Sequence, residues 1–216
     1  MRKTELAEAL RESCIIAAVQ VLDKQQLLRA VEALAAGGIR VVELSYATVR
    51  SAEWLVQALK ENRLLVGVGA VTRSSQARES GMLGADFITA AVISPDVAAA
   101  CKEMDIPCIL SGFTPTEIWR ALEMEADFVR IPEDLGGPHY IHSLRETLPA
   151  RCLVGAEIPL ESYLSYLEAG IEVLEFKSSL ALPKLAEQEE WAEISRRASK
   201  IVNACNSWRA NPNSRA

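Results

Sequence analysis

An arginine interrupts an apolar run in the second half of the chain. Arg130 lies between Val129 and Ile131, in a segment typical of a short buried strand that ends at a proline. A guanidinium group stays protonated in proteins, so burying it requires a compensating partner. We therefore expect Arg130 to form an ion pair with Glu43 or Glu157.

Other apolar runs also carry polar residues near their ends. Side chains of a strand alternate between two faces, so residues two apart share a face. If the apolar faces meet outer helices, the polar faces point inward, and in segment 151–157 this places Leu153, Gly155 and Glu157 on the inner face. With Arg130, the predicted cluster contains Gln20, Glu43, Ser45, Glu157, Glu175 and Lys177. The alternative is that these charges are solvated at the ends of strands.

Eight strand-and-helix units must position these side chains. The predicted strands are 14–20, 39–45, 64–71, 86–92, 107–111, 126–131, 151–157 and 173–178, with helical patterns between them. This alternation predicts an α/β fold, a single closed parallel (β/α)8 TIM barrel with an extra N-terminal helix. An open doubly wound sheet is the alternative, but no G-x-G-x-x-G motif follows the first strand. We expect one domain over residues 1–208 and a frayed tail over 209–216.

Composition limits the possible partners and the compartment. The chain has 216 residues, is 50% hydrophobic and carries a formal charge of −6, which fits one domain with a full core and argues against a nucleic-acid partner. No apolar run approaches the ~20 residues of a membrane span, and no signal-peptide core is present. The five cysteines are widely spaced, which predicts reduced core thiols in a cytoplasmic protein.

Several motifs resemble one enzyme family. They are A-A-G-G-I-R-V-V-E-L at 35–44, V-G-V-G-A-V at 66–71, A-A-A-C-K-E-M-D-I-P at 98–107, T-P-T-E-I at 114–118, A-D-F-V-R at 126–130 and L-G-G-P at 135–138. Together they resemble the bacterial 2-keto-3-deoxy-6-phosphogluconate (KDPG) / 4-hydroxy-2-oxoglutarate (KHG) aldolases. The resemblance implies a (β/α)8 barrel that cleaves its substrate reversibly to pyruvate. It also implies a lysine Schiff base, a homotrimer and no cofactor.

The residues at the family's chemical positions depart from this pattern. Arg130 falls where the Schiff-base lysine is expected, or Val129 if the alignment gap is placed earlier, and neither side chain can form an imine. Glu43 matches the family's proton-shuttling glutamate. Ala47 and Ala70 replace an arginine and a threonine of the pyruvate site. The resemblance therefore predicts that Schiff-base catalysis is lost or changed.

The family's phosphate site is also altered. Its backbone N–H groups come from a Gly-Gly and a Gly-Ser pair, and here the matching pairs are Ala156-Glu157 and Lys177-Ser178. A carboxylate in this cradle would repel a phosphate, so we expect an internal Glu157–Lys177 ion pair and weak binding of sugar phosphates.

Three alternatives stay open at this point. The chain could be an active lyase with Lys177 as a relocated imine lysine, or with a divalent metal held by Glu43, Glu133 and Asp134. It could also be a non-catalytic subunit that binds a small oxo acid or a partner protein. His139 and His142 are three residues apart, but we expect them to lie on the surface, so no metal ligand is assigned.

Overall fold

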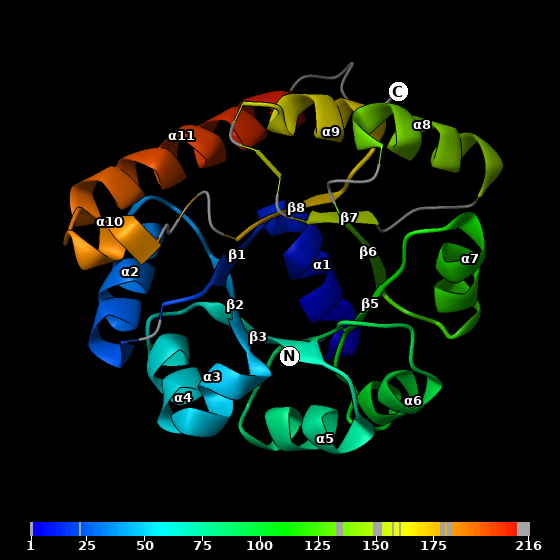
Figure 1. Cartoon of the computed structure of the whole chain (residues 1–216), viewed down its shortest axis with the longest axis horizontal. Helices are drawn as coiled ribbons and strands as arrows, with labels where there is room; N and C mark the ends of the chain where they lie inside the picture. The colour runs from blue at the N-terminus through cyan, green and yellow to red at the C-terminus, as the bar shows by residue number, and fades with distance from the viewer. Residues whose placement is uncertain are drawn as a thin grey trace.

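Eight parallel strands form a closed barrel. The computed structural model describes residues 2–21, 23–132, 136–148, 153–156, 158–159, 161–177, 180 and 183–210. Each strand pairs with its neighbour in sequence, and the last closes onto the first (Figure 1). The strands are β1 Ile15–Val19, β2 Val41–Ser45, β3 Leu65–Val71, β4 Phe87–Ala90, β5 Cys108–Ser111, β6 Phe128–Pro132, β7 Leu153–Ala156 and β8 Val173–Phe176. The predicted (β/α)8 barrel is therefore confirmed.

Helices cover the outside of the barrel, and one further helix closes an end. They are α1 Lys3–Ser13, α2 Lys24–Ala36, α3 Tyr46–Ser51, α4 Trp54–Glu61, α5 Ser74–Met82, α6 Pro95–Glu103, α7 Pro115–Glu123, α8 Gly137–Thr147, α9 Tyr163–Ala169, α10 Pro183–Glu187 and α11 Trp191–Ala210. No helix among the described residues is long and apolar enough to span a membrane. Helix α11 continues to Ala210, beyond the predicted start of the tail, and residues 211–216 lie outside the described ranges.

Local sequence signals explain where several of these helices begin. The Asp23 carboxylate accepts hydrogen bonds from the backbone N–H groups of Gln25 and Gln26 at the start of α2. Thr114 and Glu117 form a reciprocal capping box at the start of α7. Such caps satisfy N–H groups that have no partner inside the helix.

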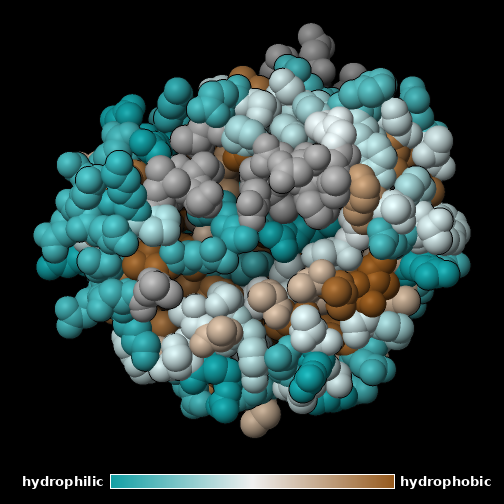
Figure 2. Space-filling view, in the orientation of Figure 1, coloured by the Kyte–Doolittle hydropathy of each residue, from teal (hydrophilic) through white to brown (hydrophobic). Residues whose placement is uncertain are grey.

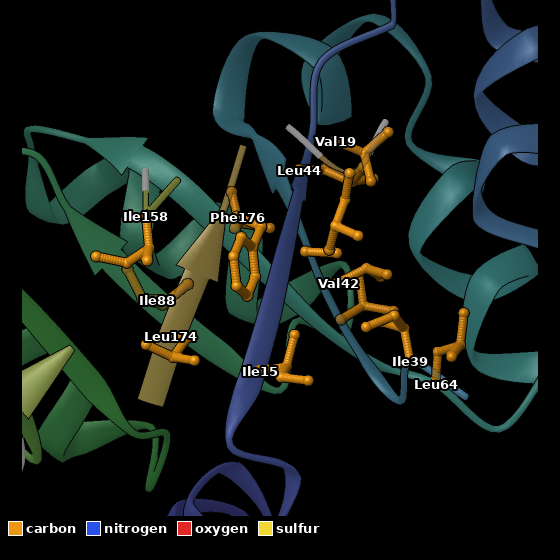
Figure 3. Packing of buried hydrophobic residues seen from close by; sticks show 14 of the residues in the cluster. Ile15, Val19, Ile39, Val42, Leu44, Leu64, Ile88, Ile158, Leu174 and Phe176 are labelled. Atoms are coloured by element: carbon orange, nitrogen blue, oxygen red, sulfur yellow. The ribbon is translucent and has the colours of Figure 1, made fainter. Parts of the chain in front are cut away.

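The strands separate two apolar cores. The outer core lies between the strands and the covering helices, and it includes Ile15, Val42, Leu44, Leu174 and Phe176, which belong to one packed cluster (Figure 3). Strands buried on both faces are typical of parallel sheets covered by helices.

The inner core fills one end of the barrel. It contains Ile16, Val41, Phe87, Ile109, Phe128, Val154 and Val173, together with Ala7 and Leu10 of α1. Figure 1 shows α1 lying across the ring of strands. The Arg11 guanidinium lies 4.8 Å from the centroid of the Phe128 ring, which adds a cation–π contact to this closure.

The described cysteines behave as small core residues. Cys14, Cys101, Cys108 and Cys205 are all buried, and no disulfide joins any two of these four. The fifth, Cys152, lies outside the described ranges.

Candidate functional site

The even-numbered strands bring four polar side chains to one level inside the barrel. At the end closed by α1, β2, β4, β6 and β8 contribute Val41, Phe87, Phe128 and Val173 to the inner core. Two residues further along each strand the side chain returns to the same face. In barrels of this kind, alternate strands supply the four residues of one layer. That layer, here called the polar layer, consists of Glu43, Thr89, Arg130 and Glu175.

The charge of Arg130 is matched within this layer. Its Nη2 lies 2.7 Å from Oε1 of Glu175, a side chain that is only 1% exposed. Arg130 therefore pairs with a carboxylate inside the barrel, as expected, but Glu175 occupies the place predicted for Glu43 or Glu157. Strand phase could place several carboxylates at this level, and only the three-dimensional arrangement decides which of them reaches the guanidinium. Glu157 lies outside the described residues.

Glu43 is held by a hydroxyl group and has no ion pair with any described residue. The Thr89 hydroxyl donates to its Oε2 at 2.5 Å, and the residue is 7% exposed. Gly69 on β3 makes room for the carboxyl group, because a Cβ at that position would lie 2.0 Å from Oε1 of Glu43. The position of Glu43 therefore depends on a missing side chain as well as on a hydrogen bond.

The environment of Glu43 favours its neutral form. Burial raises the pKa of this carboxyl group, and the Glu175 carboxylate raises it further. Three groups oppose the shift without cancelling it, namely Arg130, Thr89 and Lys177. The resulting pKa is about 8, so Glu43 carries a proton at neutral pH.

The remaining predicted residues lie beyond the polar layer or outside the described chain. Lys177 follows β8, is partly buried and is close enough to lower the pKa of Glu43. Ser45 caps α3, with its Oγ 3.1 Å from the Thr48 backbone nitrogen and 2.8 Å from the Thr48 hydroxyl oxygen. Gln20 is exposed after β1. Nothing is described for Ser178.

The predicted phase of β7 is wrong by one residue. Val154 belongs to the inner core, whereas Gly155 faces Ile158 and Ile171 on the outer side. The inward assignment therefore fails at Gly155, while the side chains of Leu153 and Glu157 lie outside the described part of the structure. A continuous apolar run has no polar alternation to fix its phase, so the sequence carries no signal of which face is inside.

The sequence analysis did not identify two residues that hold Glu43 in place, Thr89 and Gly69. Thr89 lies in an apolar stretch and reads as an ordinary strand residue. Gly69 lies in a glycine-containing strand, and a glycine inside a strand can mark a close approach of another group. That signal does not identify Glu43 as the group concerned.

The other ionisable candidates lie away from the polar layer. All lysines except Lys177 belong to helices, including Lys3, which pairs with Asp127 at 3.0 Å. His142 lies 3.5 Å from Glu146 on the exposed face of α8, and His139 is also exposed. No group of three or more His, Cys, Asp or Glu residues suited to a metal ion occurs in the described part of the chain.

The face onto which the barrel opens is polar at its centre. Figure 2 shows hydrophilic residues in the hollow at the middle of this face, in the orientation of Figure 1. The polar layer contributes Glu43, Arg130 and Glu175 to this end, and Lys177 follows β8. Together they can hold a proton, present positive charge and donate hydrogen bonds to a small ligand.

Comparisons with known proteins point to one family. The family model described as KDPG and KHG aldolase matches residues 6–197. A 2-dehydro-3-deoxy-phosphogluconate aldolase of Treponema pallidum (strain Nichols) is 31% identical over 140 residues, which span 63% of this chain and 67% of the relative. The Haemophilus influenzae (strain ATCC 51907 / DSM 11121 / KW20 / Rd) protein of the same name is 24% identical over 204 residues, 92% of this chain and 96% of the relative.

A solved structure supports the same fold. The crystal structure of KDPG aldolase from Legionella pneumophila, with pyruvate captured at low pH as a covalent carbinolamine intermediate, superimposes with a TM-score of 0.81. The two chains are 20% identical, and the match covers 91% of this chain and 97% of the other.

Proposed function

Because the chain belongs to the KDPG and KHG aldolase family, we propose that it binds a small oxo acid at the barrel mouth without forming an imine on β6. The observation that carries this proposal is the partly buried ion pair between Arg130 and Glu175. Arg130 lies on β6, the strand on which the family resemblance places the Schiff-base lysine. Family chemistry, the reversible aldol cleavage of KDPG or KHG to pyruvate, is therefore lost or changed in this chain.

The chemistry of the guanidinium group supports the loss of covalent capture. Carbinolamine and imine formation require a neutral amine that attacks a carbonyl carbon. A guanidinium group cannot be deprotonated in a protein, so Arg130 can only donate hydrogen bonds and provide positive charge. Its Nε is buried and has no hydrogen-bond partner among the described residues. A ligand oxygen at this nitrogen would satisfy a donor that is costly to leave unpaired.

The hydrogen-bond donors of the polar layer favour an oxygen-rich ligand. Arg130 has a buried Nε without a hydrogen-bond partner among the described residues, and neutral Glu43 can donate its O–H group. Donors of this kind suit the oxygen atoms of an oxo acid. Glu43 is also suited to act as a general acid, because its pKa of about 8 lies close to neutral pH.

Borohydride trapping with pyruvate tests the proposal directly. The purified protein, incubated with pyruvate and borohydride, should show no added mass, while calorimetry should detect pyruvate binding that Arg130→Met weakens at least about tenfold. Recovery of a reduced pyruvate adduct on the protein would overturn the proposal. Absence of any pyruvate binding would instead support a non-catalytic subunit.

A second candidate function is an active lyase that uses Lys177 as a relocated imine lysine. It is favoured by one observation, the electrostatic contact between Lys177 and Glu43 at the barrel mouth. The matched control is Lys177→Arg, which keeps the charge and removes the nucleophile. An adduct in the wild type that disappears in this variant would establish the second function.

A further inference from the structure

The polar layer contains more carboxyl groups than cations. Glu43 and Glu175 contribute two carboxyl groups, and Arg130 contributes the single guanidinium. Both glutamates are buried, at 7% and 1% exposed, so neither can rely on water for its charge. Arg130 makes its close contact with only one of them, and an unpaired buried charge is costly, so the other carboxyl group is favoured in its neutral form.

Geometry decides which of the two glutamates is ionised. Arg130 makes its short contact with Glu175, at 2.7 Å, whereas Glu43 receives a hydrogen bond from the neutral hydroxyl group of Thr89. Lys177 lies just after β8 and acts on Glu43 as a nearby charge. The polar and charged groups that face Glu43 within the described chain are Thr89 on β4, Arg130 on β6, Glu175 on β8, and Lys177 directly after β8.

We infer that Glu175 is a positioning residue that captures Arg130 and so leaves Glu43 as a neutral carboxylic acid able to donate a hydrogen bond to a ligand oxygen. This role deepens the proposed function, on which it rests for the identity of the mouth as the ligand site. The resemblance to the family assigns Glu43 a role, but it assigns none to Glu175.

The Glu43 carboxyl group therefore carries its proton before a ligand binds. In the wild type, Glu43 presents an O–H donor at neutral pH. If Glu175 loses its charge, Arg130 becomes available to the second carboxyl group, which should then ionise and pair with it. The barrel mouth would then lose the O–H donor of Glu43 and would contain an ion pair between Arg130 and Glu43 in place of the pair between Arg130 and Glu175.

Infrared spectroscopy on three variants tests this role. The C=O stretch of a protonated carboxylic acid should be present in the wild type at pH 7 and absent in Glu43→Gln, which identifies the band. It should disappear at pH 7 in Glu175→Gln and return in Glu175→Asp, which restores the carboxylate. A purely structural role for Glu175 would not move the band in this pattern.

Two outcomes would overturn the inference. One is a wild-type spectrum at pH 7 that is identical to that of Glu43→Gln, since Glu43 would then be ionised already, and this comparison needs no change at Glu175. The other is a Glu43 band that persists unchanged in a folded Glu175→Gln protein. Neither result depends on imine formation, so a borohydride adduct would refute the proposed function while leaving this assignment standing.

Discussion

At the scale of single residues, the arginine on β6 sets the chemistry of the barrel. A lysine can lose its proton and become a nucleophile, whereas Arg130 keeps its charge and its ion pair with Glu175. Glu43 lies in the same layer, and its surroundings hold it in the neutral form. We therefore expect this chain to differ from the enzymes of its family at the scale of single residues.

The protonation of Glu43 predicts a pH-dependent stability. The pKa of this group rises from 4.5 to about 8 on folding, so between these values the folded state holds a proton that the unfolded state has released. The contribution of Glu43 to the free energy of unfolding is greatest below pH 4.5. It falls as pH rises from 4.5 to about 8, by up to about 1.4 kcal/mol per pH unit for one proton. Urea unfolding of wild type and Glu43→Gln across this range should show the wild type losing stability relative to the variant. Parallel pH profiles would contradict the prediction.

At the scale of elements, the two ends of the barrel interior differ in polarity. The end closed by α1 is filled with apolar side chains from both even and odd strands and from α1, while the next inward-facing residues of the even strands are polar. Packing of the apolar end determines the height of the polar layer along the barrel axis, because both layers lie on the same strands. Helix α1 therefore supports the site from below without contributing a residue to it.

Removing the closure at this end should destabilise the whole barrel. Leu10 is 1% exposed inside the inner core, so Leu10→Ala leaves a cavity and should cost about 2–5 kcal/mol of unfolding free energy. Glu8 lies on the exposed side of the same helix, and Glu8→Ala is the matched control, with an expected effect within about 0.5 kcal/mol. Denaturant unfolding of both variants measures the difference. Equal stabilities would show that α1 is not part of the cooperative core.

At the scale of the whole molecule, the outer surface carries large apolar side chains that the single chain leaves exposed. Trp54, Met82 and Trp119 are 51%, 87% and 45% exposed on α4, α5 and α7. Aromatic residues and methionine are enriched in interfaces between proteins. Together with the homotrimer implied by the family resemblance, this favours association of the chain with copies of itself.

A homotrimer is the expected assembly. Sedimentation equilibrium at micromolar concentration should give about three times the 23.6 kDa chain mass. Glu61→Lys, at an exposed position on α4, is the control for non-specific charge effects. This variant should leave the mass of the assembly unchanged. A single species at the monomer mass would contradict the expectation.

The amino-acid sequence by itself determines the barrel and the level of its charges. Alternating strand and helix patterns are local, and they reproduce all eight strands because apolar runs and caps act within a few residues. Phase along β2, β6 and β8 also correctly turns Glu43, Arg130 and Glu175 inward, since polar residues mark the inner face there. The prediction that Arg130 stands where the family has its Schiff-base lysine also comes from the sequence alone.

Only the tertiary structure decides how those groups are paired. The sequence offered several carboxylates to Arg130, and the distance between β6 and β8 side chains selects Glu175. It led to the wrong phase for β7, whose apolar run has no polar residue within it, and it carried no sign that Thr89 and Gly69 hold Glu43 in place. Pairing, protonation and close approach depend on contacts between residues far apart in the chain, and such contacts exist only once the barrel has closed.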